Sequence, residues 1–229
     1  MTGQQEPDFL FVMLIHHALR VDADRLAAAT LALQAGDTQR LTGLRAFFDE
    51  YRGQLCLHHA HEDDLLFPAL QGVVDESRRP IAELAAQHGT LDADLQAIGD
   101  GLGSLCTPSD DFAAERADVV SSMIGMAKHL DGHLTMEEAV VLPLMASAVP
   151  RATYKQLEAQ ARKNTPRRRA QFLIPWIVGH ATPDQRRDLF KSAPPLRVVY
   201  LVNRHRYRVF DRALLPTPNP TRSQHAFGR

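Results

Sequence analysis

Two segments decide the fold: 57–63, which reads Leu57-His58-His59-Ala60-His61-Glu62-Asp63, and 129–138, which reads His129-Leu130-Asp131-Gly132-His133-Leu134-Thr135-Met136-Glu137-Glu138. Each contains a histidine followed four residues later by a glutamate: His58 with Glu62, and His133 with Glu137. Four residues of an α-helix turn through about 400°, so both side chains point to nearly the same side, one turn apart. A divalent metal in a helical bundle needs an imidazole and a carboxylate presented together in this way. The two segments therefore predict two helices with metal-binding faces.

The sequence around each glutamate is repeated. Pro68 follows Glu62 by six residues, and Pro143 follows Glu137 by six residues, with mostly apolar residues between. We expect each proline to kink or end its helix near the last turn. The two halves look like one helix-pair unit used twice.

Working outward, apolar residues recur at helical spacing in four stretches, about 8–36, 38–72, 76–98 and 109–145. Gly99, Gly101, Gly103 and Pro108 mark a loop before the fourth stretch. Short connections between long helices predict an all-α, up-down-up-down antiparallel four-helix bundle over residues 8–150. Alternating strand-like residues occur only in the doubtful segment Leu196–Val202.

The remaining residues divide into a basic helical extension, 151–215, and a tail, 216–229, whose Pro, Thr, Ser and Arg residues predict disorder. Residues 1–150 hold 9 Lys and Arg against 23 Asp and Glu, a net charge of −14, whereas residues 151–229 hold 17 against 4, a net charge of +13. The favoured interpretation is that the extension packs on the acidic bundle. The alternative is contact with nucleic acid or an anionic membrane surface, but the extension contains no recognised nucleic-acid motif.

Composition sets further bounds. The only cysteines, Cys56 and Cys106, are fifty residues apart and form no CxxC motif, which indicates reduced thiols and a cytoplasmic protein. The apolar segment Phe9–Ile15 is too short to span a membrane and lacks the flanks of a signal peptide.

The other two predicted helices each offer a further histidine: His88 on one, and His16 or its neighbour His17 on the other, where the phase of Leu14 and Leu19 favours His16. One His-x-x-x-Glu pair is common on a solvated helix, but four helices that each offer an inward histidine are hard to explain without a metal. Burying imidazoles and carboxylates without a partner would also be costly, and a metal ion supplies that partner.

The order His, HxxxE, His, HxxxE resembles the hemerythrin-like, or HHE cation-binding, family. The resemblance implies a centre of two iron ions joined by an oxo or hydroxo group, with Glu62 and Glu137 bridging the irons. It also implies the ligand set His16, His58, Glu62, His88, His133 and Glu137. The segments Phe172–Trp176 and Arg204–Tyr207 loosely resemble the C-terminal extension of actinobacterial members, and we expect Trp176 to cover one end of the bundle.

One position departs from the family's pattern. Oxygen-carrying hemerythrins have a second histidine one turn after that of the third helix, and Asp92 occupies that position here. The resemblance therefore implies one histidine fewer, a coordination position open to peroxide, oxygen or nitric oxide, and doubt about simple oxygen transport.

Several residues near the predicted ligands have two possible interpretations. Tyr51, two turns before His58, is either a hydrogen-bond donor in the pocket or a core tyrosine. His129, one turn before His133, is either an outer partner of the centre or a spare ligand. His17, His59 and His61 lie off the proposed face or at its margin and are interpreted as solvated or as outer partners, so loss of His59 is expected to be mild.

These observations predict a non-haem di-iron protein that binds or turns over hydrogen peroxide, oxygen or nitric oxide, for example as a catalase-like or other di-iron oxidoreductase. The alternative is an oxygen or redox sensor, or an iron-binding protein without turnover, that signals through the C-terminal extension. Imidazole and carboxylate ligands alone leave iron, manganese and zinc open.

Overall fold

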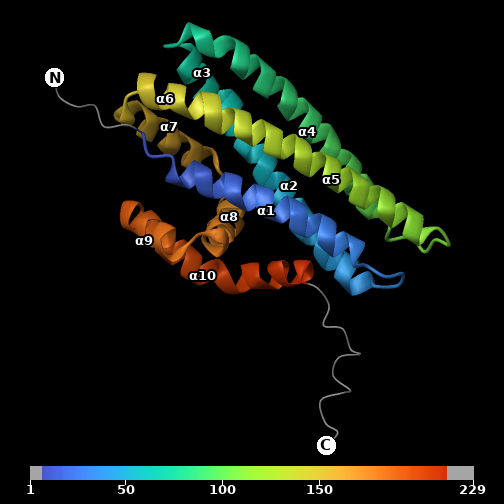
Figure 1. Ribbon diagram of the computed structural model, residues 1–229. Helices are drawn as coiled ribbons and strands as arrows, with labels where there is room; N and C mark the ends of the chain where they lie inside the picture. Colours follow the sequence, from blue (N-terminus) through green and yellow to red (C-terminus); the bar gives the residue numbers. More distant parts are fainter. Residues whose placement is uncertain (1–6, 216–229) are drawn as a thin grey trace, which may run out of the picture.

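The computed structural model describes residues 7–215, which contain helices and no β-strand. Four long helices, α1 (Leu10–Leu31), α2 (Thr38–His61), α4 (Arg78–Ser104) and α5 (Phe112–Met136), run side by side along the molecule (Figure 1). Helices α1 and α4 each pack against both α2 and α5, so the four enclose one core. The predicted all-α bundle is confirmed.

The apolar periodicity identified the core residues of α1. Leu14, Leu19, Leu26 and Leu33, which follows the helix, are each at most 1% exposed. The side chains recur every five to seven residues, so they form one stripe that faces α2 and α5. Burial of this stripe, more than intrinsic helix propensity, stabilises the long helices.

Both segments that carry a His-x-x-x-Glu pair run through a short π-helical turn. Helix α2 continues without a break into η1 (Glu62–Leu66) and α3 (Phe67–Gln71), and α5 continues into η3 (Glu137–Val141) and α6 (Leu142–Ala148). The N–H of Phe67 donates to the carbonyl of Glu62, five residues back, and Leu142 donates to Glu137 in the same way. The proline that comes next has no N–H and would clash in a regular α-turn. We attribute the π turns to these prolines, because the wider turn lets each helix continue.

Helix α4 is longer than its sequence predicts. The glycines interpreted as a loop lie within the helix, which ends at Ser104. A Cβ atom on Gly101 would lie 2.7 Å from Val119 Cγ2, and one on Gly99 would lie 3.5 Å from the Phe48 ring. Gly101 therefore allows α4 to approach α5 closely, whereas the contact at Gly99 is an ordinary van der Waals distance.

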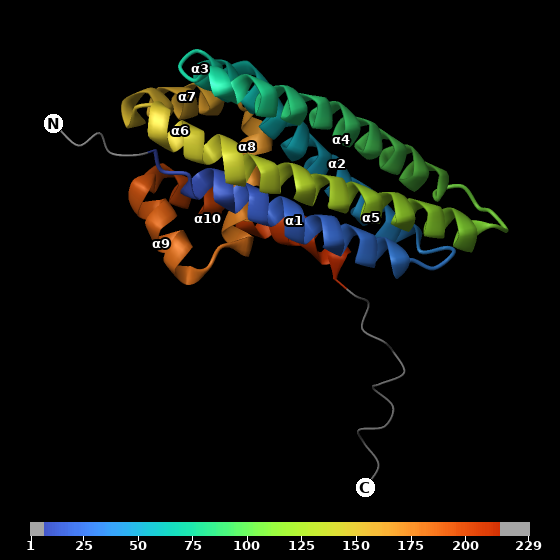
Figure 2. The ribbon, with the colours of Figure 1, turned by 45° about the horizontal axis from the view of Figure 1, so that its top comes forward.

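The chain after the bundle is also helical. It forms α7 (Arg151–Asn164), α8 (Arg167–His180), α9 (Pro183–Ser192), α10 (Pro194–Asp211) and the 3-10 turn η4 (Arg212–Leu214). The alternating segment Leu196–Val202 lies within α10, in agreement with the all-α prediction. A separate 3-10 turn, η2 (Asp75–Ser77), precedes α4. Figure 2 shows α8, α9 and α10 beside the bundle. The expected disordered tail, 216–229, lies outside the described residues.

Trp176 packs on the flank of the bundle. Its ring lies edge-on to that of Tyr51 in the middle of α2, with centroids 6.2 Å apart, and α8 contacts both α1 and α2. The expectation that Trp176 covers one end of the bundle is therefore wrong. The apolar residues of α8, including Phe172 and Ile177, join the main core.

A buried carboxylate anchors the extension. Asp22 of α1 is fully buried and accepts hydrogen bonds from Arg25 Nη1 at 2.6 Å and Trp176 Nε1 at 2.6 Å, and His180 Nε2 lies 3.2 Å away. Arg25 also donates to Asp211 of α10 at 2.7 Å. Burial alone would raise the pKa of Asp22, but His180, Arg25 and Trp176 outweigh it and lower that pKa. Asp22 therefore joins α1 to α8 and, through Arg25, to α10.

We predict that Asp22→Ala lowers the free energy of unfolding by about 3–5 kcal/mol, because it leaves the Trp176 N–H and the Arg25 guanidinium without their buried partner. Asp24→Ala, at an exposed position two residues away, should change it by less than about 0.5 kcal/mol. Urea denaturation measures both. Since the folded state lowers the pKa of Asp22, its contribution is present above the unfolded pKa of about 3.9 and declines as the pH falls below it. Equal effects of the two substitutions would contradict the anchoring role.

Candidate metal centre

Seven buried side chains from all four bundle helices converge at one level of the core. Each is at most 8% exposed. Their candidate ligand atoms form two groups, and within each group all atoms lie within 4.8 Å of one another. The first group is His16, His58, Glu62 and Glu137, and the second is His59, His88 and His133.

Glu62 connects the two groups. Its Oε1 lies 2.9 Å from His58 Nε2 in the first group, and its Oε2 lies 3.3 Å from His88 Nε2 in the second. Glu137 Oε2 lies 3.2 Å from His16 Nε2 and 3.9 Å from His58 Nε2. A carboxylate whose two oxygens face two clusters of imidazoles is suited to bridge two metal ions.

The residues fit divalent metals because their inward-facing atoms have no other partner. Despite their proximity, the Nε2 atoms and carboxylate oxygens make no hydrogen bond of acceptable geometry; these atoms are Nε2 of His16, His58, His88 and His133, both oxygens of Glu62 and Oε2 of Glu137. A buried polar atom without a partner costs about 1–3 kcal/mol. Cations placed among these atoms would remove that cost for all of them.

The electrostatics of the histidines also suit a cation. Burial, together with repulsion from His88 and His58, lowers the pKa of His59 to about 2. Burial likewise lowers the pKa of His133 to about 3. Both imidazoles are therefore neutral near pH 7, with lone pairs free for a metal. Burial opposes charge on His16 too, but Glu137 and Glu138 prevail and raise its pKa to about 9. The carboxylates around His16 thus stabilise a positive charge at this place, and a bound metal ion would provide such a charge.

The outward nitrogens of three histidines are held in place. His16 Nδ1 lies 2.8 Å from Glu138 Oε1, and His88 Nδ1 lies 3.0 Å from Asp63 Oδ2. In both halves of the repeat, the acid that follows Glu62 or Glu137 thus contacts a histidine on another bundle helix. Gln87 Oε1 lies 3.1 Å from His133 Nδ1. In a neutral imidazole, donation from Nδ1 to these oxygens leaves the lone pair of Nε2 for a metal, and at His16 the metal would replace the Nε2 proton.

His59 differs most from its sequence interpretation. It is 3% exposed, its ring stacks on that of His88 with centroids 4.0 Å apart, and neither of its nitrogens makes a hydrogen bond. Consecutive residues on a helix point about 100° apart. Because α2 packs against both α1 and α4, His58 turns toward His16 while His59 turns toward His88. The solvated alternative for His59 is therefore wrong.

The other neighbours belong to neither group. The hydroxyl of Tyr51 donates to the Leu19 carbonyl at 3.1 Å, which matches the core-tyrosine alternative. The His129 side chain is 53% exposed and pairs with Asp94. Asp92 is exposed and accepts a hydrogen bond from Cys56 Sγ at 3.7 Å. His17 is exposed and His61 is half-buried.

A comparison with protein families agrees with this geometry. The model of the hemerythrin HHE cation binding domain matches residues 11–145, more than half of the chain. The chain belongs to the hemerythrin family. The hemerythrin domain contains all seven converging residues, and α7 to α10 follow it. Comparisons with curated proteins and with solved structures gave no match. Within residues 7–215, no helix is long and apolar enough to cross a membrane.

We predict that Glu138→Ala and Asp63→Ala each weaken metal binding by about 10- to 100-fold, because His16 and His88 lose the acids that orient them. Competition with a coloured chelator measures the affinity. Asp64→Ala, at the exposed position next to Asp63, is the matched control and should bind metal as the unmodified protein does. An equal loss in the control would show that general acidity, and not these two contacts, sets the affinity.

Proposed function

We propose that the hemerythrin domain binds two iron ions, joined by an oxo or hydroxo group, and uses them to bind or turn over a small oxidant. His16, His58 and Glu137 would hold one iron, and His59, His88 and His133 would hold the other. Glu62 would bridge them, and the position of its two oxygens between the two groups carries this proposal. Glu137 is proposed as the second bridge.

His59 changes the ligand count that the sequence implied. With His59, the proposed set contains five histidines and two carboxylates. His59 of α2 would thus take the place of the second histidine that oxygen carriers have on the third bundle helix, where this chain has Asp92. The inference of one histidine fewer than an oxygen carrier therefore does not hold if His59 binds. The iron with two histidines, His16 and His58, would have fewer protein ligands and is the proposed site for an outside ligand.

The bound irons would supply redox chemistry and an exchangeable coordination position. The chain's residues would set the ligand's size and surroundings. Because every converging side chain is at most 8% exposed, the centre suits a diatomic molecule or peroxide better than a larger substrate. Glu138, which also accepts a hydrogen bond from Arg20 at 2.6 Å, would hold His16 in its orientation beside that ligand.

A sensor that works without turnover is the second candidate, and the Asp22 anchor favours it. His16 and Asp22 lie six residues apart on α1, about 9 Å along the helix axis. A ligand-dependent shift of α1 would therefore reach α8 and α10 through Trp176 and Arg25. In this version the extension transmits the state of the centre to a partner.

We predict two irons per chain and an oxo-to-iron charge-transfer band in the near ultraviolet. His59→Ala should reduce the iron content to about one per chain, as should His133→Ala, because the second group loses one of its three imidazoles. His61→Ala, two residues from His59 and outside both groups, should retain two irons. Elemental analysis of freshly purified protein measures the content. One zinc and no iron would refute the di-iron proposal, and two irons in His59→Ala would refute only the role of His59.

Exposure to hydrogen peroxide separates the two candidate functions. An enzyme that disproportionates peroxide should evolve oxygen over many turnovers, and Glu62→Ala, which removes the proposed bridge, should abolish this activity. A sensor should show a spectral change that reverses on removal of the oxidant, without sustained gas evolution. An oxygen electrode and stopped-flow absorbance record the two outcomes. If neither response occurs in protein that holds two irons, a role with peroxide is excluded.

A further inference from the structure

Helix α10 is apolar on two opposite faces. Its inner face packs against the main core through Leu196, Val199, Tyr207 and Phe210. On its outer face Val198, Leu201, Val202 and Val209 are 62%, 47%, 73% and 59% exposed, respectively. A helix buried on one face only would be polar on the other. The outer apolar side chains of α10 therefore need a separate explanation.

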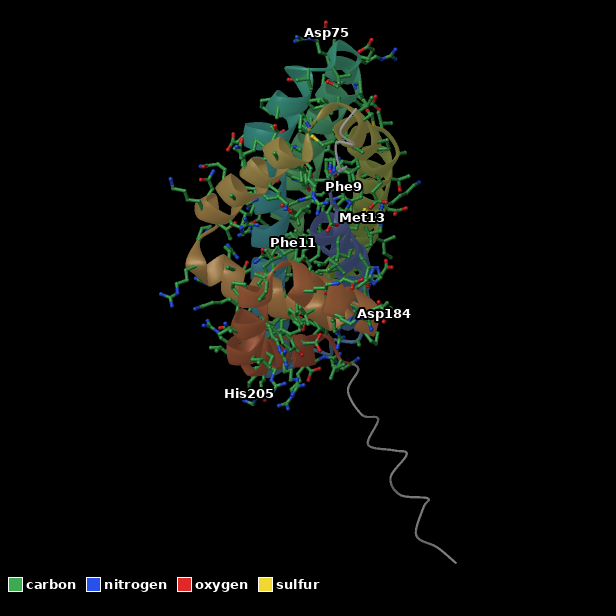
Figure 3. The ribbon with its side chains drawn as sticks, turned by 90° about the vertical axis from the view of Figure 1, so that its left-hand side faces the viewer. Phe9, Phe11, Met13, Asp75, Asp184 and His205 are labelled. Atoms are coloured by element: carbon green, nitrogen blue, oxygen red, sulfur yellow. The ribbon has the colours of Figure 1, made fainter. Side chains whose placement is uncertain are left out.

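These outer residues form one stripe, which we call the α10 stripe: Val198, Leu201, Val202 and Val209. Their spacing places them on one side of the helix, around His205, over a length of about 17 Å. His205 lies at the outer edge of the molecule, far from Asp75 at the opposite end (Figure 3). Among residues 7–215, nine apolar side chains of valine size or larger are exposed, and four of them lie in this stripe. The patch is therefore concentrated on one helix and is not ordinary scatter.

The margins of the stripe carry only positive charge. Exposed arginines flank it on both sides, namely Arg197, Arg204 and Arg208 on one side and Arg206 on the other. The only acid in α10, Asp211, accepts a hydrogen bond from Arg25 of α1, so it is directed to the bundle. The outer face of α10 thus combines aliphatic side chains with cations, and it suits an anionic partner that can also bury aliphatic groups.

Other occupants fit this face less well. A second copy paired through α10 would bring two rows of arginines together. Residues 216–229 contain Arg222 and Arg229 and no Asp or Glu, so they have the same sign of charge. Nucleic acid would contact the arginines but leave the valines in water. Stable protein interfaces usually contain aromatic anchors in fitted pockets, whereas this stripe consists of three valines and a leucine.

We propose that α10 docks the protein on an anionic lipid surface. The α10 stripe would enter the boundary between headgroups and acyl chains, and the arginines would extend along the helix to the lipid phosphates. Four small aliphatic residues bury little area, so attraction between the arginines and the lipid charge provides much of the binding. The binding should therefore weaken as salt rises. This docking is independent of the metal centre, because none of its residues belongs to either ligand group.

Sedimentation of the full-length protein with vesicles tests this proposal. The vesicles contain phosphatidylcholine alone or a mixture with phosphatidylglycerol. We expect the protein to sediment with the anionic vesicles at low salt, to remain in solution with the neutral ones, and to be released as salt is raised. The double substitution Val198→Asp and Val202→Asp should reduce the bound fraction at least about tenfold. Both positions are exposed, so circular dichroism and thermal unfolding should show an unchanged fold. Ile124→Asp, at a 59% exposed position on α5, is the matched control and should bind as before.

Three results would overturn the proposal. One is no binding to anionic vesicles at low salt. Another is unchanged binding by the double variant, which would mean that the arginines adsorb without the stripe. The third is a dimer that the double variant disrupts, seen by analytical ultracentrifugation in the absence of lipid binding. That result would assign the α10 stripe to a second copy of the chain.

Discussion

The rest of the structure depends on one constraint: the buried histidines and carboxylates of the bundle must be compensated by positive charge. Their inward atoms lie a few ångströms apart and have no hydrogen-bond partners, so this level of the core needs positive charge to be stable. That requirement explains why all four bundle helices contribute at the same level, and why Asp63, Gln87 and Glu138 hold the outer nitrogens of three of the histidines. Bound metal ions would thus stabilise the core and also supply the chemistry of the site.

The paired π turns show how a regular bundle accommodates such a centre. Each begins at a glutamate of the candidate metal centre, Glu62 or Glu137, and ends two residues before the proline. The glutamate faces the centre, and the next acid contacts a histidine of another bundle helix. The helix then continues and carries apolar residues such as Phe67 and Leu142 into the core. The pattern Glu-acid-x₄-Pro therefore occurs twice in the sequence because the same π-helical turn is used in both halves of the bundle.

Features within a single helix could be predicted from the sequence, whereas several that depend on how two helices approach each other could not. Periodicity indicated the four helices, and the His-x-x-x-Glu spacing indicated His58 with Glu62. The position of His59 depends on α2 lying between α1 and α4, which no spacing within α2 expresses. Gly101 was misinterpreted for the same reason, because its role is the approach of Val119 from α5. The segment 196–202 resembled a strand because α10 is apolar on both faces.

Only some of the basic residues of the extension pair with acidic residues of the bundle. Arg168 and Arg169 pair with the buried Glu50, but the arginines on the outer face of α10 are exposed. Attraction to the acidic bundle would turn such residues inward if charge alone positioned the extension. The inner face of α10 instead docks through Tyr207 and Phe210, and α8 docks through Trp176 and Asp22. Apolar burial and one anchored carboxylate therefore orient the extension, and this orientation leaves Arg197, Arg204, Arg206 and Arg208 of α10 exposed.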